Sequence, residues 1–419
     1  MRWKIEKHLQ PWLAPRWRER RRVRFARQDT LTSGALVSTT GLRRLFVDVS
    51  VIARHDAGTG IQRVVRHVAL DLLHHPPAGW QVIPIGATRK RPYHPIHWPG
   101  EGRARGESVL SGRPGDVFLG LDYALDTVCF HESQLAELRR QGVALWFMMY
   151  DLLPWQYPAW FSDKMVVRFR KWLGVLARRG EGFLCISPST ELVLSTVLAE
   201  HYGLSGVSMR TLPMGWDFAA QQAPALGGNE SNNVVLPLGA RSTLLMVGTL
   251  EPRKGHADIL AAFEQLWQEG RAVNLVFVGR SGWKTEQLQK TLRVHPYHQR
   301  YLFWLDNVTD EDLAQLYAVS TGVIAASYAE GFGLPLLEAL GYGKPVLARD
   351  IPVFHTLESE GLTYFPQLAD TATLAQAIVK WLETVHEPIK LPELPTWGST
   401  AHAIVEALEV DPCVKTIMP

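Results

Sequence analysis

Short apolar runs alternate with longer amphipathic segments along most of the chain. Glycine, proline or polar residues bound each run, which is typical of buried strands in a parallel sheet. Between the runs, apolar residues recur at helical spacing, as in the segments 62–73 and 396–408. The pattern predicts an α/β protein. The expected strands are 45–49, 81–85, 116–121, 144–150 and 183–187, followed by 242–247, 274–278, 301–305, 322–326 and 345–348.

A polar stretch divides these strands into two groups. Residues 221–239 are rich in Gly, Asn and Pro, which indicates a linker. The chain has 419 residues and 46% apolar content, which is enough for two cores. We therefore expect two domains with parallel sheets. Their expected order is a basic arm and linker (1–41), a first domain (42–220), a linker (221–240), a second domain (241–395) and a terminal helical segment that returns to the first domain (396–419).

The strongest candidates for functional residues lie in the stretch 327–345. An apolar strand leads into a glycine-rich loop, 330–333, and a helix follows, with Pro335 suited to its first turn. Such a loop lies at the carboxyl end of its strand, where open α/β sheets bind ligands. Glu330 and Glu338 can each accept hydrogen bonds from sugar hydroxyls. Taken singly, Glu330 also fits a helix N-terminal charge, and Glu338 a solvated helix face.

The two glutamates, separated by seven residues around G-F-G-L-P-L-L, resemble the E-x7-E signature of retaining family-4 glycosyltransferases. The resemblance implies the GT-B fold, in which two Rossmann-like domains face each other across a cleft and the C-terminal one holds most of a nucleotide-sugar. It also implies that Glu338 binds ribose hydroxyls and Glu330 the hydroxyls of the donor sugar. Further donor contacts implied here are Gly331, Phe332, Gly333 and Leu334.

The first loop of the second domain carries two adjacent cations. Arg253 and Lys254 suit a diphosphate, because arginine donates forked hydrogen bonds and lysine acts as a point charge. A solvated basic turn is the alternative. Family-4 members usually have an arginine directly after the first glycine of this loop, where the chain has Thr249 after Gly248. We expect Arg253 to supply that guanidinium, and Gly248 and Thr249 to contact the donor.

The resemblance places the nucleobase and ribose beside two further loops, at Gly279 with Arg280 and at Asn307 with Val308. The neighbouring triplet 310–312 matches the D-x-D of metal-dependent transferases, but acids that follow a threonine are ordinary at a helix start. We therefore expect a helix cap there, and no metal or other cofactor.

His295 and His298 are expected at the surface rather than as metal ligands. Cys129, Cys185 and Cys413 are far apart and form no C-x-x-C, so neither a disulfide framework nor a zinc site is expected.

Two segments of the first domain join the candidate site. A lone G-x-G is weak evidence for phosphate binding, and without the full dinucleotide fingerprint an NAD site is disfavoured. However, the phrase that contains Gly58, Thr59 and Gly60 resembles a family loop that faces the donor phosphates. Tyr150 and Asp151 begin a phrase that resembles the family's H-D-L-x-P segment, whose histidine contacts the donor sugar.

Tyr150 stands at that histidine position, and tyrosine is a poor base because its reference pKa is about 10. We place Tyr150 and Asp151 among the candidate catalytic residues as sugar or acceptor contacts, with no proton transfer assigned. A cap after the strand is the alternative for Asp151. The loop 88–115 is expected to border the acceptor.

Charge is concentrated at the N-terminus. Residues 1–30 contain ten Lys or Arg against three acids, so this arm carries +7 and the rest −4 of the net +3. Three tryptophans alternate with these arginines, a pattern that favours docking on an anionic membrane. The alternatives are a solvated arm, one docked on the protein itself, and a nucleic-acid arm, which no recognised nucleic-acid motif supports. With no signal segment and no membrane-spanning run, we expect a cytoplasmic protein, peripheral on the inner face of the membrane.

These features predict retaining transfer from a nucleoside-diphosphate sugar. The cations would stabilise the leaving diphosphate, and the lack of a clear nucleophile favours front-face attack. The phrases G-T-L-E-P-R-K and T-G-I-Q-R-V resemble those of bacterial enzymes that build O-antigen, capsule or exopolysaccharide. The first expected donor is therefore GDP-mannose or a GDP-6-deoxyhexose, before a UDP-hexose or dTDP-rhamnose. The expected acceptor is a lipid-linked oligosaccharide, with other polysaccharide-assembly enzymes as partners. Two rival classes are a GT-B isomerase or phosphorylase, which would share the two domains but not the E-x7-E block, and a glycosyltransferase-like scaffold with weak or no catalysis.

Overall fold

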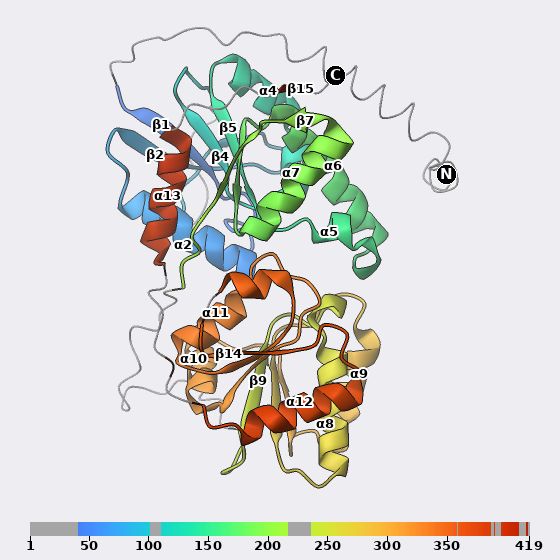
Figure 1. Ribbon diagram of the computed structural model, residues 1–419. Coiled ribbons are helices and arrows are strands. Elements are labelled where there is room, and N and C mark those ends of the chain that lie inside the picture. Colours follow the sequence, from blue (N-terminus) through green and yellow to red (C-terminus); the bar gives the residue numbers. More distant parts are fainter. Residues whose placement is uncertain are drawn as a thin grey trace, which may run out of the picture. The chain divides into compact units, whose positions relative to one another are not determined.

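The computed structural model describes residues 41–100, 110–216, 236–357, 359–386, 389, 395–409 and 416–417 (Figure 1). The basic arm, most of the expected linker and Cys413 lie outside them. The described residues form two compact units. Unit 1 comprises those within 1–152, 167–212 and 401–419, and unit 2 those within 153–166 and 213–400.

Unit 1 is built on a seven-stranded sheet in which all neighbouring strands are parallel except the edge pair. In spatial order its strands are β3 (His94–Pro95), β2 (Trp80–Gly86), β1 (Arg43–Asp48), β4 (Val117–Gly120), β5 (Ala144–Met149), β6 (Gly182–Cys185) and β8 (Ser208–Thr211). Consecutive residues of β1, Leu45 and Phe46, are both at most 1% exposed, as expected for a strand covered on both faces.

Two helices of unit 1 begin at a capping side chain. Thr59 caps α2 in a reciprocal box with Gln62, and Ser187 caps α7. The helices with residues in this unit are α2 (Gly60–His74), α3 (Leu125–Phe130), α4 (Glu132–Arg140), α6 (Asp163–Arg179), α7 (Pro188–Tyr202) and α13 (Trp397–Glu409). The short strands β7 (Leu204–Ser205) and β15 (Thr416–Ile417) pair antiparallel. The expected loop 88–115 also contains the edge strand β3, so its interpretation as loop throughout is wrong.

Unit 2 holds a six-stranded sheet whose neighbours are all parallel. In spatial order the strands are β11 (Leu302–Leu305), β10 (Asn274–Val278), β9 (Thr243–Val247), β12 (Gly322–Ala325), β13 (Val346–Arg349) and β14 (Leu362–Phe365). Its helices are α5 (Leu153–Gln156), α8 (His256–Gln268), α9 (Glu286–Val294), α10 (Asp310–Val319), α11 (Leu334–Gly341) and α12 (Thr371–Glu383), with the 3₁₀ turns η1 (Pro158–Trp160), η2 (Pro252–Lys254) and η3 (Pro352–Thr356).

The pleat of β9 directs its side chains into two separate cores. Leu244 and Met246 pack with α8, α9 and α12 on one face of the sheet, while Leu245 packs with α10 and α11 on the other (Figure 1). Helices on both faces explain why these strands read as continuous apolar runs rather than alternating ones. The α/β class and the parallel sheets expected from the sequence are confirmed.

Strand order reverses once in each sheet. In unit 2 the chain builds β9, β10 and β11 outward and then places β12 on the other side of β9. In unit 1 the corresponding reversal lies between β1 and β4. Loops that leave the carboxyl ends of the two strands at such a point diverge, and the crevice between them is where open α/β sheets bind ligands.

A short segment between β5 and α6 belongs to unit 2. Leu153, Phe161 and Val166 form a small cluster against which Ala329 packs. The loop after β10 holds the same segment, because Lys284 Nζ donates to the carbonyl oxygens of Ala159 and Phe161 at 2.5 and 2.7 Å. Among the described residues, no helix combines the length and apolar character needed to cross a bilayer.

Candidate active site

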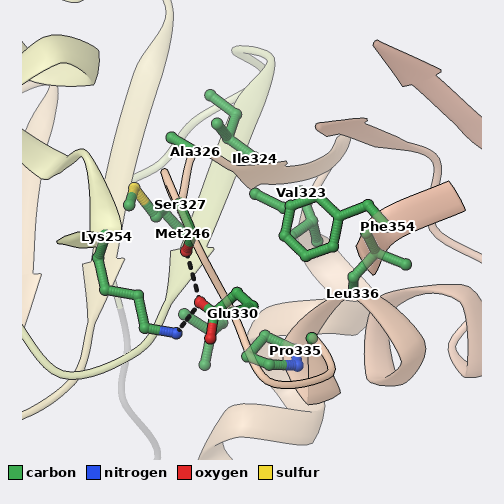
Figure 2. A pocket seen from close by; sticks show the side chains of 13 residues that line it. Met246, Lys254, Val323, Ile324, Ala326, Ser327, Glu330, Pro335, Leu336 and Phe354 are labelled. Carbon is green, nitrogen blue, oxygen red and sulfur yellow. Dashed lines mark hydrogen bonds and ion pairs between the residues drawn. The ribbon is translucent and has the colours of Figure 1, made fainter. Parts of the chain in front are cut away.

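Glu330 lies at the reversal point of the unit 2 sheet, in the loop that leaves β12. Lys254 Nζ donates to its Oε1 at 2.5 Å, and Ser327 Oγ donates to the same oxygen at 2.5 Å. Arg253 Nη1 donates to Oε2 at 2.7 Å. Figure 2 shows Lys254 and Ser327 converging on Glu330 within a pocket. Two strands adjacent in space, β9 and β12, thus bring together residues far apart in the sequence.

The carboxylate of Glu330 is ionised in this setting. Its side chain is 10% exposed, and burial alone would raise its pKa, but the charges of Arg253 and Lys254 outweigh burial and lower the pKa from 4.5 to about 2. An ionised carboxylate accepts hydrogen bonds and donates none. Glu330 therefore offers an acceptor to hydroxyl groups near neutral pH and is unsuited to act as a general acid.

Arg253 is held by more than Glu330. Its Nε donates to Glu251 Oε2 at 2.8 Å, and its Nη1 also donates to the Ala329 carbonyl oxygen at 3.1 Å. The side chain is 14% exposed, so the alternative of a solvated basic turn is wrong. Glu251 and Ser327 were not predicted. The available signals were a glutamate two residues before an arginine and a serine three residues before a glutamate, and both are common in unrelated loops.

Glycines allow the loops around these charges to pack closely. Gly248 has φ +147° and Gly279 has φ +153°, and a Cβ on Gly279 would lie 2.1 Å from the Gly248 carbonyl oxygen. The loops that follow β9 and β10 are therefore in direct contact. Thr249 and Arg280, the expected donor contacts, are the next residues of these two loops.

The helix α11 begins as expected from its sequence. Gly333 precedes it with φ +110°, and Pro335 lies in its first turn. Gly331, Phe332 and Gly333 thus form the turn between Glu330 and the helix, and Leu334 is the first residue of the helix. Glu338 is 2% exposed and its Oε2 accepts from the Tyr317 hydroxyl at 3.1 Å, so the solvated-face alternative is wrong.

The pocket beside Glu330 has a polar side and an apolar side. Lys254, Ser327 and Glu330 supply the polar groups, while Pro335, Leu336 and Phe354 line the apolar side (Figure 2). Convergent charged groups beside apolar side chains are the usual composition of a small-molecule site.

Most of the remaining residues predicted in unit 2 follow β11, the edge strand of the same sheet. Asn307 and Val308 follow β11 and directly precede Thr309. Thr309 and Asp312 form a reciprocal capping box on α10, which confirms the interpretation of the acidic triplet as a helix start. The expectation for His295 is wrong, because this residue is only 8% exposed and its Nε2 lies 2.9 Å from Glu264 Oε1.

The expected site residues of unit 1 lie at the carboxyl ends of its strands. Gly58, Thr59 and Gly60 form the start of α2, where Thr59 is the cap. Tyr150 directly follows β5 and is 3% exposed, and its hydroxyl donates to the Leu121 carbonyl oxygen at 2.7 Å. Asp151 is the next residue. The contacts predicted between these residues and a substrate stay predictions.

Unit 1 also holds a buried carboxylate pair that was not predicted. Asp48 ends β1 and Asp122 follows β4, on either side of the reversal point of this sheet. Burial and the charge of Asp122 raise the pKa of Asp48 to about 7, although hydrogen bonds from Ser50 and Tyr93 oppose the shift. Burial likewise raises the pKa of Asp122 to about 6.

Asp122 fastens the loop after β1. Its Oδ2 accepts from the amides of Val51 and Ile52 at 2.6 and 2.8 Å, while its Oδ1 finds no hydrogen-bond partner among the described residues. Asp48 Oδ1 accepts from the amide and hydroxyl of Ser50 at 2.9 and 2.5 Å. The two carboxylates therefore set the start of the loop that continues to Thr59.

Comparisons with known proteins identify the domain that carries Glu330. Residues 230–391 match the family model described as glycosyl transferases group 1. The chain is 36% identical over 383 residues to the serotype-specific mannosyltransferase WbdA of Escherichia coli, which covers 88% of this chain but 45% of that protein. It is also 36% identical over 108 residues, 26% of this chain, to an O-antigen chain mannosyltransferase B of the same organism, 28% of whose length is covered. The chain thus spans about half the length of the WbdA relatives it matches.

Solved structures agree on the fold. The sucrose-phosphate synthase of Thermosynechococcus elongatus has a TM-score of 0.55 at 18% identity, with 88% of this chain and 94% of that chain covered. WaaG, a glycosyltransferase involved in lipopolysaccharide biosynthesis, has a TM-score of 0.51 at 15% identity, with 88% and 95% covered. The fold is GT-B, and residues 230–391 are similar to the glycosyl transferases group 1 family. The family resemblance indicated by the sequence is confirmed.

Proposed function

We propose that the protein is a retaining glycosyltransferase that moves mannose from GDP-mannose to a growing surface glycan. The observation that carries the proposal is the buried cluster of Glu330, Lys254 and Arg253 at the reversal point of the sheet, inside the matched domain. An ionised carboxylate beside two cations provides acceptors for sugar hydroxyls and positive charge for a diphosphate.

In this mechanism the cations stabilise the charge that develops as the diphosphate leaves. Positioned donors of this kind are most effective in a dry site, and both side chains are at most 14% exposed. Glu330 binds hydroxyls of the donor sugar, Glu338 those of the ribose, and the amides of Gly331, Phe332 and Gly333 contact the sugar or phosphate. An acceptor hydroxyl attacks the anomeric carbon on the face from which the diphosphate leaves. The new C–O bond forms as the bond to the diphosphate breaks, and the hydroxyl proton passes to the departing phosphate oxygen, with no metal or other cofactor.

The relatives support mannose over other sugars, because WbdA and the other Escherichia coli relative are mannosyltransferases. The second name specifies an O-antigen chain, which supports a glycan acceptor. We propose a lipid-linked oligosaccharide as that acceptor, and residues 1–30 as a contact to an anionic membrane surface where other assembly enzymes work. Liposome flotation of the full chain against one lacking residues 1–30 tests the membrane contact; equal binding would contradict it.

Nucleotide binding is the first test of the proposal. Thermal unfolding of the protein is measured with GDP, UDP, dTDP and ADP, each with and without Mg²⁺. A ligand at 100 times its Kd stabilises the folded state by about 2.7 kcal/mol. The expected result is stabilisation by GDP that does not depend on Mg²⁺. Preference for UDP or dTDP would contradict GDP-mannose as the donor and favour a UDP- or dTDP-sugar. Binding of none of the four nucleotides would favour the scaffold alternative.

Transfer to a synthetic mannose-containing acceptor then tests the assignments. Glu330→Gln keeps the shape of the side chain but removes its charge, and Arg271→Met is the matched control, because Arg271 pairs with Glu383 at an exposed position of the same unit. We expect transfer by the glutamine variant to fall by about 10²-fold, while the control keeps the wild-type rate. An unchanged rate in the glutamine variant would remove Glu330 from the mechanism.

A further inference from the structure

Arg349 is a buried arginine outside the cluster described above, at the end of β13. Its side chain is 1% exposed, yet its guanidinium group donates three hydrogen bonds. Nε donates to the Ala326 carbonyl oxygen at 2.8 Å, and Nη1 to the Gln367 carbonyl oxygen at 2.6 Å. Nη2 donates to Asp258 Oδ2 at 2.7 Å. One planar group thereby joins the carboxyl ends of three neighbouring strands, β12, β13 and β14, to the first turn of α8.

Tyr328 connects this guanidinium to the site. The centroid of its ring lies 3.9 Å from the Arg349 Cζ atom, and its hydroxyl donates to Asp258 Oδ2 at 2.5 Å. The backbone amide of Tyr328 donates to the Arg253 carbonyl oxygen at 2.8 Å. The two residues before it in the chain are Ser327, which donates to Glu330, and Ala326, which accepts from Arg349.

These contacts connect Arg349 to two charged residues of the site, Glu330 and Arg253. On one side, Ala326 and Tyr328 flank Ser327 and thereby fix the strand end from which Glu330 extends. On the other, the Tyr328 amide fixes the main chain of Arg253. A planar guanidinium with three bonded edges tolerates little rotation, so its partners keep their relative positions. Small displacements of reacting groups cost large factors in rate, and for this reason such bracing matters to a transfer site.

We infer that Arg349 is a positioning residue, which acts through Asp258 and Tyr328 to hold Arg253 and Glu330 at the spacing the transfer requires. This inference rests on the proposed function for its kinetic consequence, but the bracing itself does not depend on which substrate binds. A residue that only fills space could be replaced by an apolar side chain of similar length. A positioning residue could not, because methionine offers no donors to Ala326 or Asp258.

Hydrogen exchange tests the bracing without a substrate. The rate of amide hydrogen exchange is measured in the peptide that contains residue 328. The proteins compared are the wild type, Arg349→Met, Arg349→Lys, Tyr328→Phe and the control Arg271→Met. We expect exchange in the peptide containing Tyr328 to become about tenfold faster in the methionine variant and less so in the other two site variants. Peptides of β10 should exchange as in the wild type. Wild-type exchange at Tyr328 in the folded methionine variant, or an equal increase in β10, would overturn the inference.

Kinetics test its consequence. Tyr328→Phe loses a single hydroxyl and keeps the ring that contacts Arg349. This variant therefore replaces Arg349→Met in the kinetic test if the methionine variant does not fold. We expect kcat for transfer to fall by about tenfold in Tyr328→Phe and more in Arg349→Met, with the control unchanged. Faster local exchange with wild-type kcat would refute the positioning role. If the wild type itself transfers no sugar, the proposed function fails, and the exchange data alone decide whether Arg349 braces the loop.

Discussion

Lys254 Nζ lies 2.5 Å from Glu330 Oε1, although 76 residues separate the two in the sequence. Both side chains are at most 11% exposed, so neither charge is satisfied by bulk water. The contact compensates the buried charge of Lys254, and together with Arg253 it compensates the buried charge of Glu330.

Removing the lysine should therefore weaken both the fold and the reaction. In Lys254→Met, Glu330 keeps Arg253 and Ser327 as donors, so we expect a loss of about 1–3 kcal/mol in the free energy of unfolding. The value of kcat/KM should fall by about 10²-fold, because the variant loses one of the two cations that we propose to stabilise the leaving diphosphate. Urea unfolding and steady-state kinetics measure the two effects. In a double-mutant cycle with Glu330→Gln, additive losses of stability would contradict a direct Lys254–Glu330 interaction.

The lowered pKa of Glu330 predicts a loss of stability in acid. Because the folded-state pKa is about 2 against 4.5 for the free side chain, the contribution is complete above pH 4.5 and is lost as the pH falls from 4.5 to 2. Its size is about 3 kcal/mol. Glu330→Gln should lose less stability than the wild type across this window, as measured by urea unfolding at each pH. The exposed Glu383 supplies the control, and a Glu330→Gln curve parallel to both wild type and Glu383→Gln would refute the assignment.

The buried carboxylate of Asp48 predicts the opposite slope. Its pKa of about 7 in the folded protein exceeds 3.8, so the folded state binds more protons and stability falls as the pH rises from 3.8 to 7. The full effect is about 4 kcal/mol. Asn can still accept at Oδ1, so Asp48→Asn should fold and show a shallower decline over this range. Unfolding free energies measured from pH 4 to pH 7.5 decide the question. If the free energy of unfolding of Asp48→Asn declines as steeply as that of the wild type, groups other than Asp48 cause the pH dependence.

We predict that Lys284 holds the segment 157–161 in place. It has φ +55°, a left-handed conformation uncommon for residues other than glycine, and its two bonds to carbonyl oxygens of that segment stabilise the arrangement. Lys284→Ala loses the bonds and keeps the strain, whereas Lys284→Gly loses the bonds and relieves it. We expect chymotrypsin to cleave the segment about tenfold faster in both variants, with a greater loss of stability for alanine. Wild-type cleavage in both would show that other contacts hold the segment.

Much of this fold could be predicted from the sequence because parallel strands buried on both faces leave a clear apolar signal. The strand expected at 274–278 coincides with β10, and the cap at Thr309 follows from purely local chemistry. Glu330 and Lys254 could be selected because they lie in loops directly after such strands. Their contact could be inferred only from the family resemblance, since nothing local in either segment specifies that β9 and β12 are neighbours.

The parts that could not be predicted depend on contacts over long sequence separations. Arg349 looks like the polar end of a strand, and its burial depends on Asp258, 91 residues away. His295 looks like a surface residue for the same reason, because its partner Glu264 lies in a different helix. The pairing of Asp48 with Asp122 requires knowledge of strand order, which the apolar pattern does not contain.

The membership of residues 153–166 in unit 2 bears on how this protein can be recombined with its relatives. The chain passes between the units at 152/153, 166/167, 212/213 and 400/401, so a single crossover in the linker would separate Ala329 and Lys284 from the segment they contact. A chimera that exchanges unit 2 must therefore carry residues 153–166 from the same parent. Libraries built on this rule would exchange unit 2 and keep the contacts that Ala329, next to Glu330, and Lys284 make with this segment.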